Sequence, residues 1–470
     1  MQSYGIFFIL QNSFVLFYCF LQFYFAIQLS IIKKILSFIC KFLLFIIVLQ
    51  LFVIKSIKIM EKMFLKAVTA LFISGSLLCS CNDDDDAADL VIDPEPEFTI
   101  PENTVDLSAN GTANCYLVTP GTAGAFDARF KGNSTTIETG DVAGVKLLWQ
   151  TAPGLVKELD YDKTAKKIYA LTDERDGNAL VAAVDAAGNV LWSWHLWITD
   201  YDPDNDYVTA PNVNGTTWTF MDRNLGATST AHGSFDSFGM LYQWGRKDPF
   251  PAAASFTVMN DDYTYEKDGE PTVYDFAGNP LPKFASLAAP HGSIDLSIAN
   301  PMVFYTNIKK STGEIDEYGD PVMVDDWLTG DWIENPDDDL WGGVSQKKSI
   351  YDPSPVGYKV PVCDEAGATP YDWLTYASMT WDTAGRGAEQ DGQWFPATGT
   401  RVYASGTVDY PETGNPYSGL WIGTKGKEAS DLTAYPTRYG QYMFIINGKR
   451  TFKVNKDRRS QGLSLRCVRE

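Results

Sequence analysis

The sequence predicts a β-rich α+β fold, and two observations support that prediction. Short runs of β-branched and aromatic residues alternate with clusters of Gly, Asn, Asp and Pro, a pattern typical of strands joined by turns. Amphipathic helical periodicity is almost absent after residue 90, apart from two short stretches in the second half of the chain.

Residues 1–59 differ from the rest in composition, since they contain no Asp or Glu and consist mainly of Phe, Ile, Leu, Tyr and Lys. Two apolar stretches, 5–32 and 35–54, are long enough to cross a bilayer as helices. They are either two transmembrane helices or upstream DNA that is read as protein because the start of the gene was placed too early. We favour the second interpretation, because a complete signal peptide with its own Met60 or Met63 follows them.

Residues 60–80 have the form of a bacterial lipoprotein signal peptide, with a charged start, an apolar core over 67–78 and small residues before Cys81. We expect cleavage before Cys81 and lipid attachment to its thiol, with a plain secretion signal as the alternative. The aspartates 83–86 resemble the acidic export signal of Bacteroides lipoproteins. That resemblance implies a lipid anchor in the outer membrane and exposure at the cell surface.

The charge of the chain is strongly acidic, at −21 for all 470 residues. From Cys81 onward 31 Lys and Arg stand against 58 Asp and Glu, which is a net charge near −27. Such a balance disfavours binding to nucleic acid or to an anionic membrane surface. It favours solubility, cation binding or contact with neutral glycans.

Residues 81–103 are acidic and contain Pro, so we expect an extended tether. The following region, 104–206, predicts a β-sandwich, because about a hundred residues are divided among short strands. Segments 178–185 and 190–197 flank a turn that contains Gly188 and predict a β-hairpin. Alternation along its second strand places two sets of side chains on opposite faces: Val190, Trp192, Trp194 and Leu196, and Leu191, Ser193, His195 and Trp197.

Residues 207–470 form a second, larger predicted domain, with short helices expected over 234–244 and 369–378. Five of its motifs occur in an order found in a known family. They are Trp218 with 221–226 (MDRNLG), 241–246 (LYQWGR), 352–361 (DPSPVGYKVP), 395–401 (FPATGTR) and 465–468 (LRCV). The segment resembles the Fibrobacter succinogenes major paralogous domain of surface lipoproteins. The resemblance implies a C-type lectin-like α+β fold over 207–470.

The first domain is similar to a segment that precedes this domain in Bacteroides fimbrillin-like proteins. The similarity rests on residues 113–116 (ANCY), 177–181 (GNALV) and 191–197 (LWSWHLW). It implies a role at the cell surface, with fimbrial subunits as partners.

Three cysteines, Cys115, Cys363 and Cys467, follow the expected lipidation residue Cys81, and Cys363 with Cys467 is the disulfide that we expect in an oxidising envelope. The family that the chain resembles usually has cysteine where this chain has Ser354, so a missing cross-link is the alternative. Formylglycine-generating enzymes share the fold and need a pair of reactive cysteines that bind copper. Since Cys467 belongs to the C-terminal motif, we expect no such oxidase activity here.

Two acidic segments are candidates for calcium. Alternating carboxylates at Asp200, Asp202, Asp204 and Asp206 can converge on a hard cation. The spacing is not that of an EF-hand, since Tyr207 and Val213 occupy the glycine and glutamate positions counted from Asp202. Residues 334–339 are the second segment. The alternative for both is solvated loop charge.

Tryptophans are the remaining hint of a ligand site. We expect Trp341, Trp373, Trp394 and Trp421 to include exposed rings that stack on sugars or anchor a protein partner. The alternative is that these rings fill the core.

These patterns predict a cell-surface lipoprotein that serves adhesion or ligand binding, with a fimbria-associated subunit as one form of that role. A glycan-capture component of a polysaccharide uptake system is the alternative. An enzyme is the least supported class, because no nucleophile elbow or zinc-protease motif occurs. His195, between tryptophans on a strand, is expected to be a packed residue rather than a catalytic base.

Overall fold

The computed structural model describes residues 98–261, 265–287, 292–306, 309–315, 321–325, 330–375, 377–413, 417–426, 439–446 and 451–470. Pro94–Glu470 forms one compact unit, apart from a unit formed by Met1–Asp93. The predicted lipidation residue Cys81, the signal peptide and residues 1–59 lie outside the described residues. In the described part of the chain, no helix has the length and apolarity needed to span a membrane.

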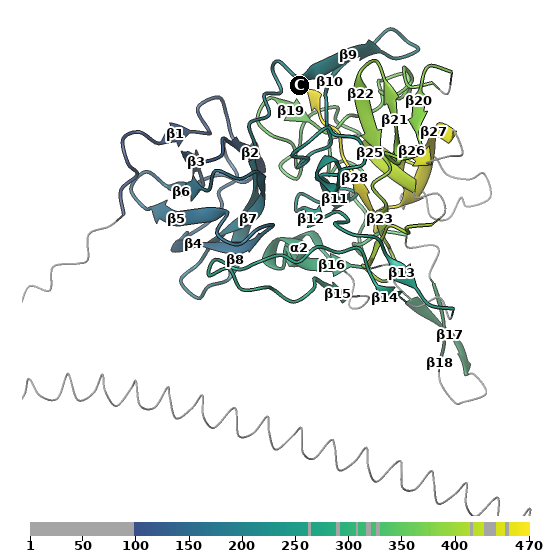
Figure 1. Cartoon of the computed structure of the whole chain (residues 1–470). Coiled ribbons are helices and arrows are strands. Elements are labelled where there is room, and N and C mark those ends of the chain that lie inside the picture. Colours follow the sequence, from purple (N-terminus) through teal and green to yellow (C-terminus); the bar gives the residue numbers. More distant parts are fainter. Residues whose placement is uncertain are drawn as a thin grey trace, which may run out of the picture. The chain divides into compact units, whose positions relative to one another are not determined.

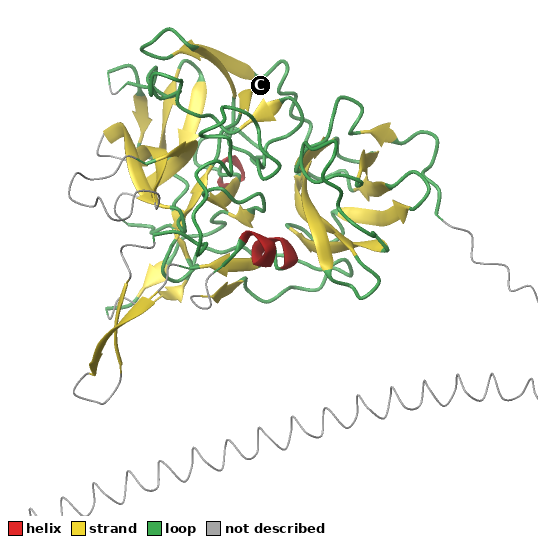
Figure 2. Cartoon of the chain, turned by 180° about the vertical axis from the view of Figure 1, so that it is seen from behind, coloured by secondary structure: helices red, strands yellow, loops and turns green. Residues whose placement is uncertain are grey.

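The β-rich character predicted from the sequence is confirmed (Figure 2). The described residues contain one α-helix, α2 (Ile294–Ala299), and one short 3₁₀ helix, η1 (Phe235–Ser237). The helix predicted over 234–244 is wrong beyond this single turn. Gly239, at φ 73°, ends the turn, and the buried residues that follow form strand β11 (Met240–Gln243). Residues 369–378 form turns instead of the predicted helix, as far as they are described.

Two four-stranded sheets make up the first part of the unit (Figure 1). The first has the order β1 (Val105–Asp106), β3 (Ala123–Asp127), β6 (Lys167–Thr172) and β5 (Val156–Asp162). The second has the order β2 (Cys115–Val118), β8 (Val190–Ile198), β7 (Gly177–Val184) and β4 (Gly144–Gln150). Phe126 and Ile168 of one sheet share a hydrophobic cluster with Val181 and Trp194 of the other, which joins the two sheets.

The predicted β-hairpin is confirmed, because β7 and β8 pair in antiparallel register. Its two faces enter different cores. Trp192, Trp194 and Leu196 pack between the two sheets, whereas Trp197 packs with Met221 and other residues of the second half of the chain. Strand β8 is therefore buried on both faces, which explains its continuous apolar sequence.

The rest of the unit is built on a second set of sheets. The largest contains β12 (Phe250–Pro251), β11, β28 (Gly462–Ser464), β25 (Tyr417–Lys425), β26 (Tyr439–Ile446) and β27 (Thr451–Arg458), with β23 (Thr400–Arg401) and β24 (Val408–Asp409) beside it. A four-stranded sheet has the order β19 (Tyr358–Lys359), β29 (Val468–Arg469), β10 (Thr217–Met221) and β9 (Tyr207–Pro211). A three-stranded sheet contains β20 (Thr380–Asp382), β21 (Gly387–Gln390) and β22 (Gln393–Pro396).

Three two-stranded sheets complete the described strands. They are β13 (Val258–Met259) with β14 (Tyr265–Lys267), β15 (Ala285–Leu287) with β16 (Val303–Tyr305), and β17 (Lys309–Ile315) with β18 (Pro321–Asp325). The last pair extends away from the larger sheets in Figure 1.

Arginines of the sequence motifs lie in the interior of residues 207–470 and stack on aromatic rings there. The guanidinium carbon of Arg466 lies 4.1 Å from the ring centroid of Phe395, and that of Arg246 lies 4.8 Å from the ring of Phe250. Arg401 is fully buried and pairs with Glu270 at 2.7 Å. A buried charge is tolerated only when it is paired and hydrogen-bonded, so these motif residues hold the fold together rather than meet a ligand.

Candidate functional site

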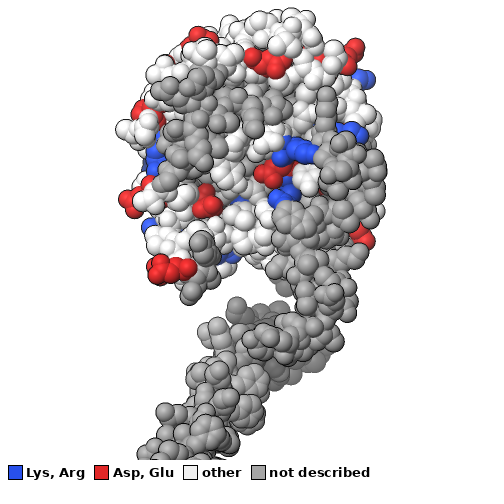
Figure 3. Space-filling view, turned by 90° about the vertical axis from the view of Figure 1, so that its right-hand side faces the viewer, with Lys and Arg blue, Asp and Glu red and all other residues white. Residues whose placement is uncertain are grey.

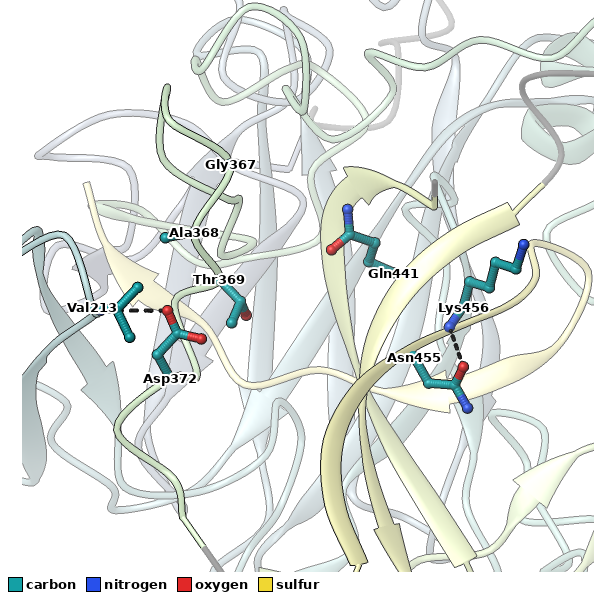
Figure 4. Close-up of a pocket in the computed structure, with 8 residues that line it drawn as sticks. All are labelled: Val213, Gly367, Ala368, Thr369, Asp372, Gln441, Asn455 and Lys456. Carbon is teal, nitrogen blue, oxygen red and sulfur yellow. Dashed lines mark hydrogen bonds between the residues drawn. The ribbon is translucent and has the colours of Figure 1, made fainter. Parts of the chain in front are cut away.

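A surface cavity of about 490 Å³ lies where a hairpin turn, a loop and two strands meet. Val213 in the turn between β9 and β10 lies beside the loop 364–372, and Gln441, Asn455 and Lys456 belong to β26 and β27 (Figure 4). Gly215, at φ 81°, allows the tight turn in which Asn212 both donates to and accepts from the backbone of the next residues.

Asp364 fastens the turn to the loop. Its carboxylate accepts from Nδ2 of Asn212 at 2.8 Å, from Nδ2 of Asn214 at 2.9 Å and from the backbone N–H of Ala368 at 2.8 Å. The hydrogen bonds from Asn214 and Asn212 lower the pKa of Asp364 to about 2. The carboxylate therefore stays ionised and holds both walls of the cavity in place.

Asp372 has a different setting in the same cavity. It accepts one long hydrogen bond, 3.4 Å, from the backbone N–H of Val213. Burial raises its pKa above the ordinary value. Figure 4 shows Lys456 on the opposite side from Val213 and Asp372, with its side chain directed away from them. Its ammonium lies 5.3 Å from the ring centroid of Tyr439. Asp372, Gln441, Asn455 and Lys456 thus line one cavity, with the 77% exposed Val213 among its lining residues.

A second cavity of about 370 Å³ lies on the other side of the same loop. Asn214, Thr216, Gln346 and Asp364 line it, and Trp218 contributes a ring that is 9% exposed. Because both cavities share the turn and the loop, we call them together the 364–372 groove. The sequence placed Trp218 in a fold motif and did not single out any residue of the groove as a ligand contact.

Three of the four predicted ligand tryptophans are buried, which corrects the expectation of exposed rings. Trp341, Trp394 and Trp421 are at most 3% exposed. Trp421 donates from Nε1 to the carbonyl of Tyr242 at 2.7 Å, and His232 covers Trp394 in a stack at 3.8 Å. These rings fill the core, since their polar and apolar faces both meet protein.

Trp373, the fourth, is partly buried. Its ring tilts against Phe220, with 5.8 Å between the ring centroids. It lines neither cavity of the 364–372 groove.

The calcium prediction is also wrong in this structure. The Asp202 carboxylate accepts a hydrogen bond from the backbone N–H of Asp204 at 3.0 Å. The Asp204 carboxylate accepts one from the guanidinium of Arg469 at 2.8 Å. Among the described residues, no group of three His, Cys, Asp or Glu could hold a metal ion. In the second acidic segment, Asp338 pairs with Lys425 at 2.9 Å and with Arg459. Figure 3 shows acidic and basic groups interspersed on one face of the molecule.

The predicted disulfide between Cys363 and Cys467 is absent, and both side chains are buried. The Cys363 thiol donates to Oε1 of Gln441 at 3.5 Å, beside the groove. Burial raises the pKa of Cys467 to about 12, and an interaction with the Ser354 hydroxyl offsets part of that rise. Ser354 is thus the neighbour of Cys467, at the position where the family that the chain resembles has its cysteine.

Cys115, His195 and Asn178 have the residue types of a cysteine-hydrolase triad, but not its charge state. Nδ2 of Asn178 donates to the carbonyl of Gly226, so its Oδ1 accepts from Nε2 of His195 at 2.8 Å. Nδ1 of His195 then faces the Cys115 thiol at 3.4 Å. Burial lowers the pKa of His195 to about 3 and raises that of Cys115 well above its usual range. Both groups are neutral, whereas a nucleophile needs the thiolate.

Comparison with known proteins leaves the family open. No family model matches the chain, and no curated protein matches it. A solved structure with some likeness is an auxiliary nutrient binding protein from Bacteroides ovatus. It is 12% identical, the match covers 75% of this chain and 87% of that chain, and the TM-score is 0.12. A TM-score this low supports no shared fold.

Proposed function

We propose that this chain is a cell-surface lipoprotein that binds a polar ligand in the 364–372 groove. One observation carries the proposal. Residues with unlike polar side chains, Asp372, Gln441, Asn455 and Lys456, line one cavity together with Val213, which precedes Lys456 by more than 200 residues in the sequence. Concave sites with a few convergent polar groups are the usual form of a ligand pocket.

Binding fits these groups better than catalysis does. The Cys115 thiol and the His195 imidazole are buried and neutral, and Asp364 is occupied by its own hydrogen bonds. General acid–base chemistry needs a group that can exchange a proton with a substrate, and nucleophilic chemistry needs an activated nucleophile. The Asp372 carboxyl remains as a binding group.

A glycan is the ligand class that we propose for the groove. Sugar hydroxyls both donate and accept. The amides of Asn214, Gln346, Gln441 and Asn455 each use one N–H within the protein, and an amide has a second N–H and further lone pairs to offer. Trp218 also lines the groove, but it is 9% exposed and packs with Phe220 and Val362, so hydrogen bonds rather than ring stacking would hold the sugar. This form of the proposal corresponds to glycan capture at the cell surface.

The test is a glycan array probed with the purified full chain and two lysine variants. Lys456→Ala removes the groove ammonium, and Lys146→Ala removes an exposed lysine of β4 as the matched control. We expect a selective glycan signal that falls at least tenfold with the first variant and is unchanged with the second. A signal that both variants retain places the site elsewhere. Absence of any glycan signal, with capture of a purified surface protein instead, supports the adhesion role.

A further inference from the structure

A separate pair of hollows lies on the first part of the unit, on either side of a short hairpin over residues 129–139. Phe130 and Glu138 form a β-bridge, and the backbone N–H of Lys131 donates to the carbonyl of Ile137 at 2.9 Å. The hollows measure about 370 and 540 Å³. Arg129 and Phe130 line both of them, so we call these two residues the Arg129–Phe130 ledge.

The ledge is held in place at both ends. At its base, Arg129 pairs with the buried carboxylate of Asp127, with 2.8 Å from Nε to Oδ2. At the hairpin tip, Nδ2 of Asn133 donates to the carbonyl of Lys348 at 3.0 Å. Gly132 lies so close to Ile350 that a Cβ there would be 2.3 Å from its carbonyl oxygen. A surface fixed in this way loses little freedom when a ligand binds.

The side chains around the ledge indicate the class of ligand. The 540 Å³ hollow is lined by neutral hydrogen-bonding residues, including Asn110, Thr112, Ser134 and Thr135, and by charges of both signs, Arg129 with Asp127 and Glu470. The other hollow carries charges of both signs, with Lys163 and Lys166 beside Glu138 and Asp141. Charges that offset one another select neither an anion nor a cation.

Phe130 supplies the apolar surface between the hollows. Its ring is partly exposed, and the guanidinium carbon of Arg129 lies 5.5 Å from the ring centroid. A flat ring flanked by hydroxyl and amide groups suits a molecule that has an apolar face and many hydroxyls. Since a hollow lies on each side of the ring, the molecule must be elongated to fill both.

We infer that the Arg129–Phe130 ledge and its two hollows bind a neutral oligosaccharide that crosses the 129–139 hairpin. One sugar packs on the ring of Phe130, and its neighbours in the chain occupy the hollows on either side. This site is distinct in sequence and lining from the 364–372 groove, so it gives the protein a second contact with a glycan chain. Two sites on one chain strengthen attachment to a polymer through effective concentration.

The experiment is calorimetric titration of the full chain with neutral hexasaccharides of glucose, xylose and mannose, and with the matching monosaccharides. We expect at least one hexasaccharide to bind at least tenfold more tightly than its monosaccharide. Phe130→Ala is expected to weaken that binding at least tenfold. Phe276→Ala is the matched control, because Phe276 is 49% exposed and lines neither hollow.

The outcomes separate this inference from the function proposed for the groove. If Lys456→Ala weakens hexasaccharide binding and Phe130→Ala leaves it unchanged, the inferred ledge site is wrong and the groove is the binding site. The reverse pattern supports the ledge alone. No hexasaccharide binding, or binding of an extended peptide in its place, also overturns the ledge. If Phe130→Ala does not fold, Phe130→Leu keeps the apolar volume without the flat ring and provides the same comparison.

Discussion

Nε2 of His195 lies 2.8 Å from Oδ1 of Asn178 in the interior of the protein, and burial there holds the imidazole neutral. Burial lowers the pKa of His195 to about 3, whereas the unfolded chain has the ordinary value near 6.5. Between these values only the unfolded chain binds the proton. Stability therefore falls as the pH drops, and we expect His195 to cost about 2 kcal/mol between pH 7 and pH 5.

Urea unfolding at pH 7 and pH 5 measures this contribution. His195→Gln is expected to flatten the pH dependence by that amount. Ser345→Ala is the control, because it removes no titratable group at an exposed position and should leave the slope unchanged. Equal slopes for the wild type and His195→Gln would show that the folded protein already protonates this imidazole.

The strands of the first part could be predicted from sequence because their signals are local. Two apolar runs on either side of a turn that contains Gly188 predict the β7–β8 hairpin without any tertiary information. The helix predicted over 234–244 failed for a tertiary reason, since β11 joins a sheet through β28, more than 200 residues away. The groove could not be predicted for the same reason, because Asn212, Asp364 and Lys456 form no pattern along the chain.

Trp421→Ala should destabilise the protein rather than remove a ligand contact. The ring is fully buried and its Nε1 donates to the carbonyl of Tyr242, so the substitution leaves a cavity and an unpaired carbonyl. We expect a loss of about 3–5 kcal/mol in the free energy of unfolding, measured in urea. Phe276→Ala, at an exposed aromatic position, should change it by less than about 0.5 kcal/mol. Weaker glycan binding at unchanged stability would restore the sequence-based interpretation of Trp421.

Asp364→Ala should loosen the 364–372 groove without unfolding the chain. The substitution removes the acceptor of the Asn212 and Asn214 amides and of the Ala368 N–H. We expect faster hydrogen exchange at Ala368 and across the turn 212–216. Asp372→Ala is the control, since Asp372 accepts no hydrogen bond from Ala368. Unchanged exchange at Ala368 in Asp364→Ala would mean that the loop is held by other contacts.

Ser354→Cys should form a disulfide with Cys467. The Ser354 hydroxyl acts on the Cys467 thiol, and both residues are buried in the same region. The cross-link would close a loop from residue 354 to residue 467, for which loop-closure entropy gives up to about 5 kcal/mol, so the Tm should rise and should fall again with reductant. Peptide mapping identifies the bond. Ser345→Cys, at an exposed position, should remain a thiol. A free thiol at position 354 in the folded variant would show that the two side chains do not approach closely enough.

The lipid anchor is tested by exchanging one cysteine of a neighbouring pair. Cys81 follows the apolar core and small residues of the signal peptide, so it is the residue that we expect to carry lipid, whereas Cys79 lies within the segment that is removed. Acyl chains contribute about 0.8 kcal/mol per buried methylene, which is enough to keep the protein with the membrane fraction. Cys81→Ser should therefore release the protein and abolish its acylated mass, while Cys79→Ser should leave both unchanged. Release of both cysteine variants alike would instead indicate a plain secretion signal.

Replacing Asp83, Asp84, Asp85 and Asp86 by alanine should retain the lipid but protect the protein from protease added to whole cells, because the acidic run is the expected export signal.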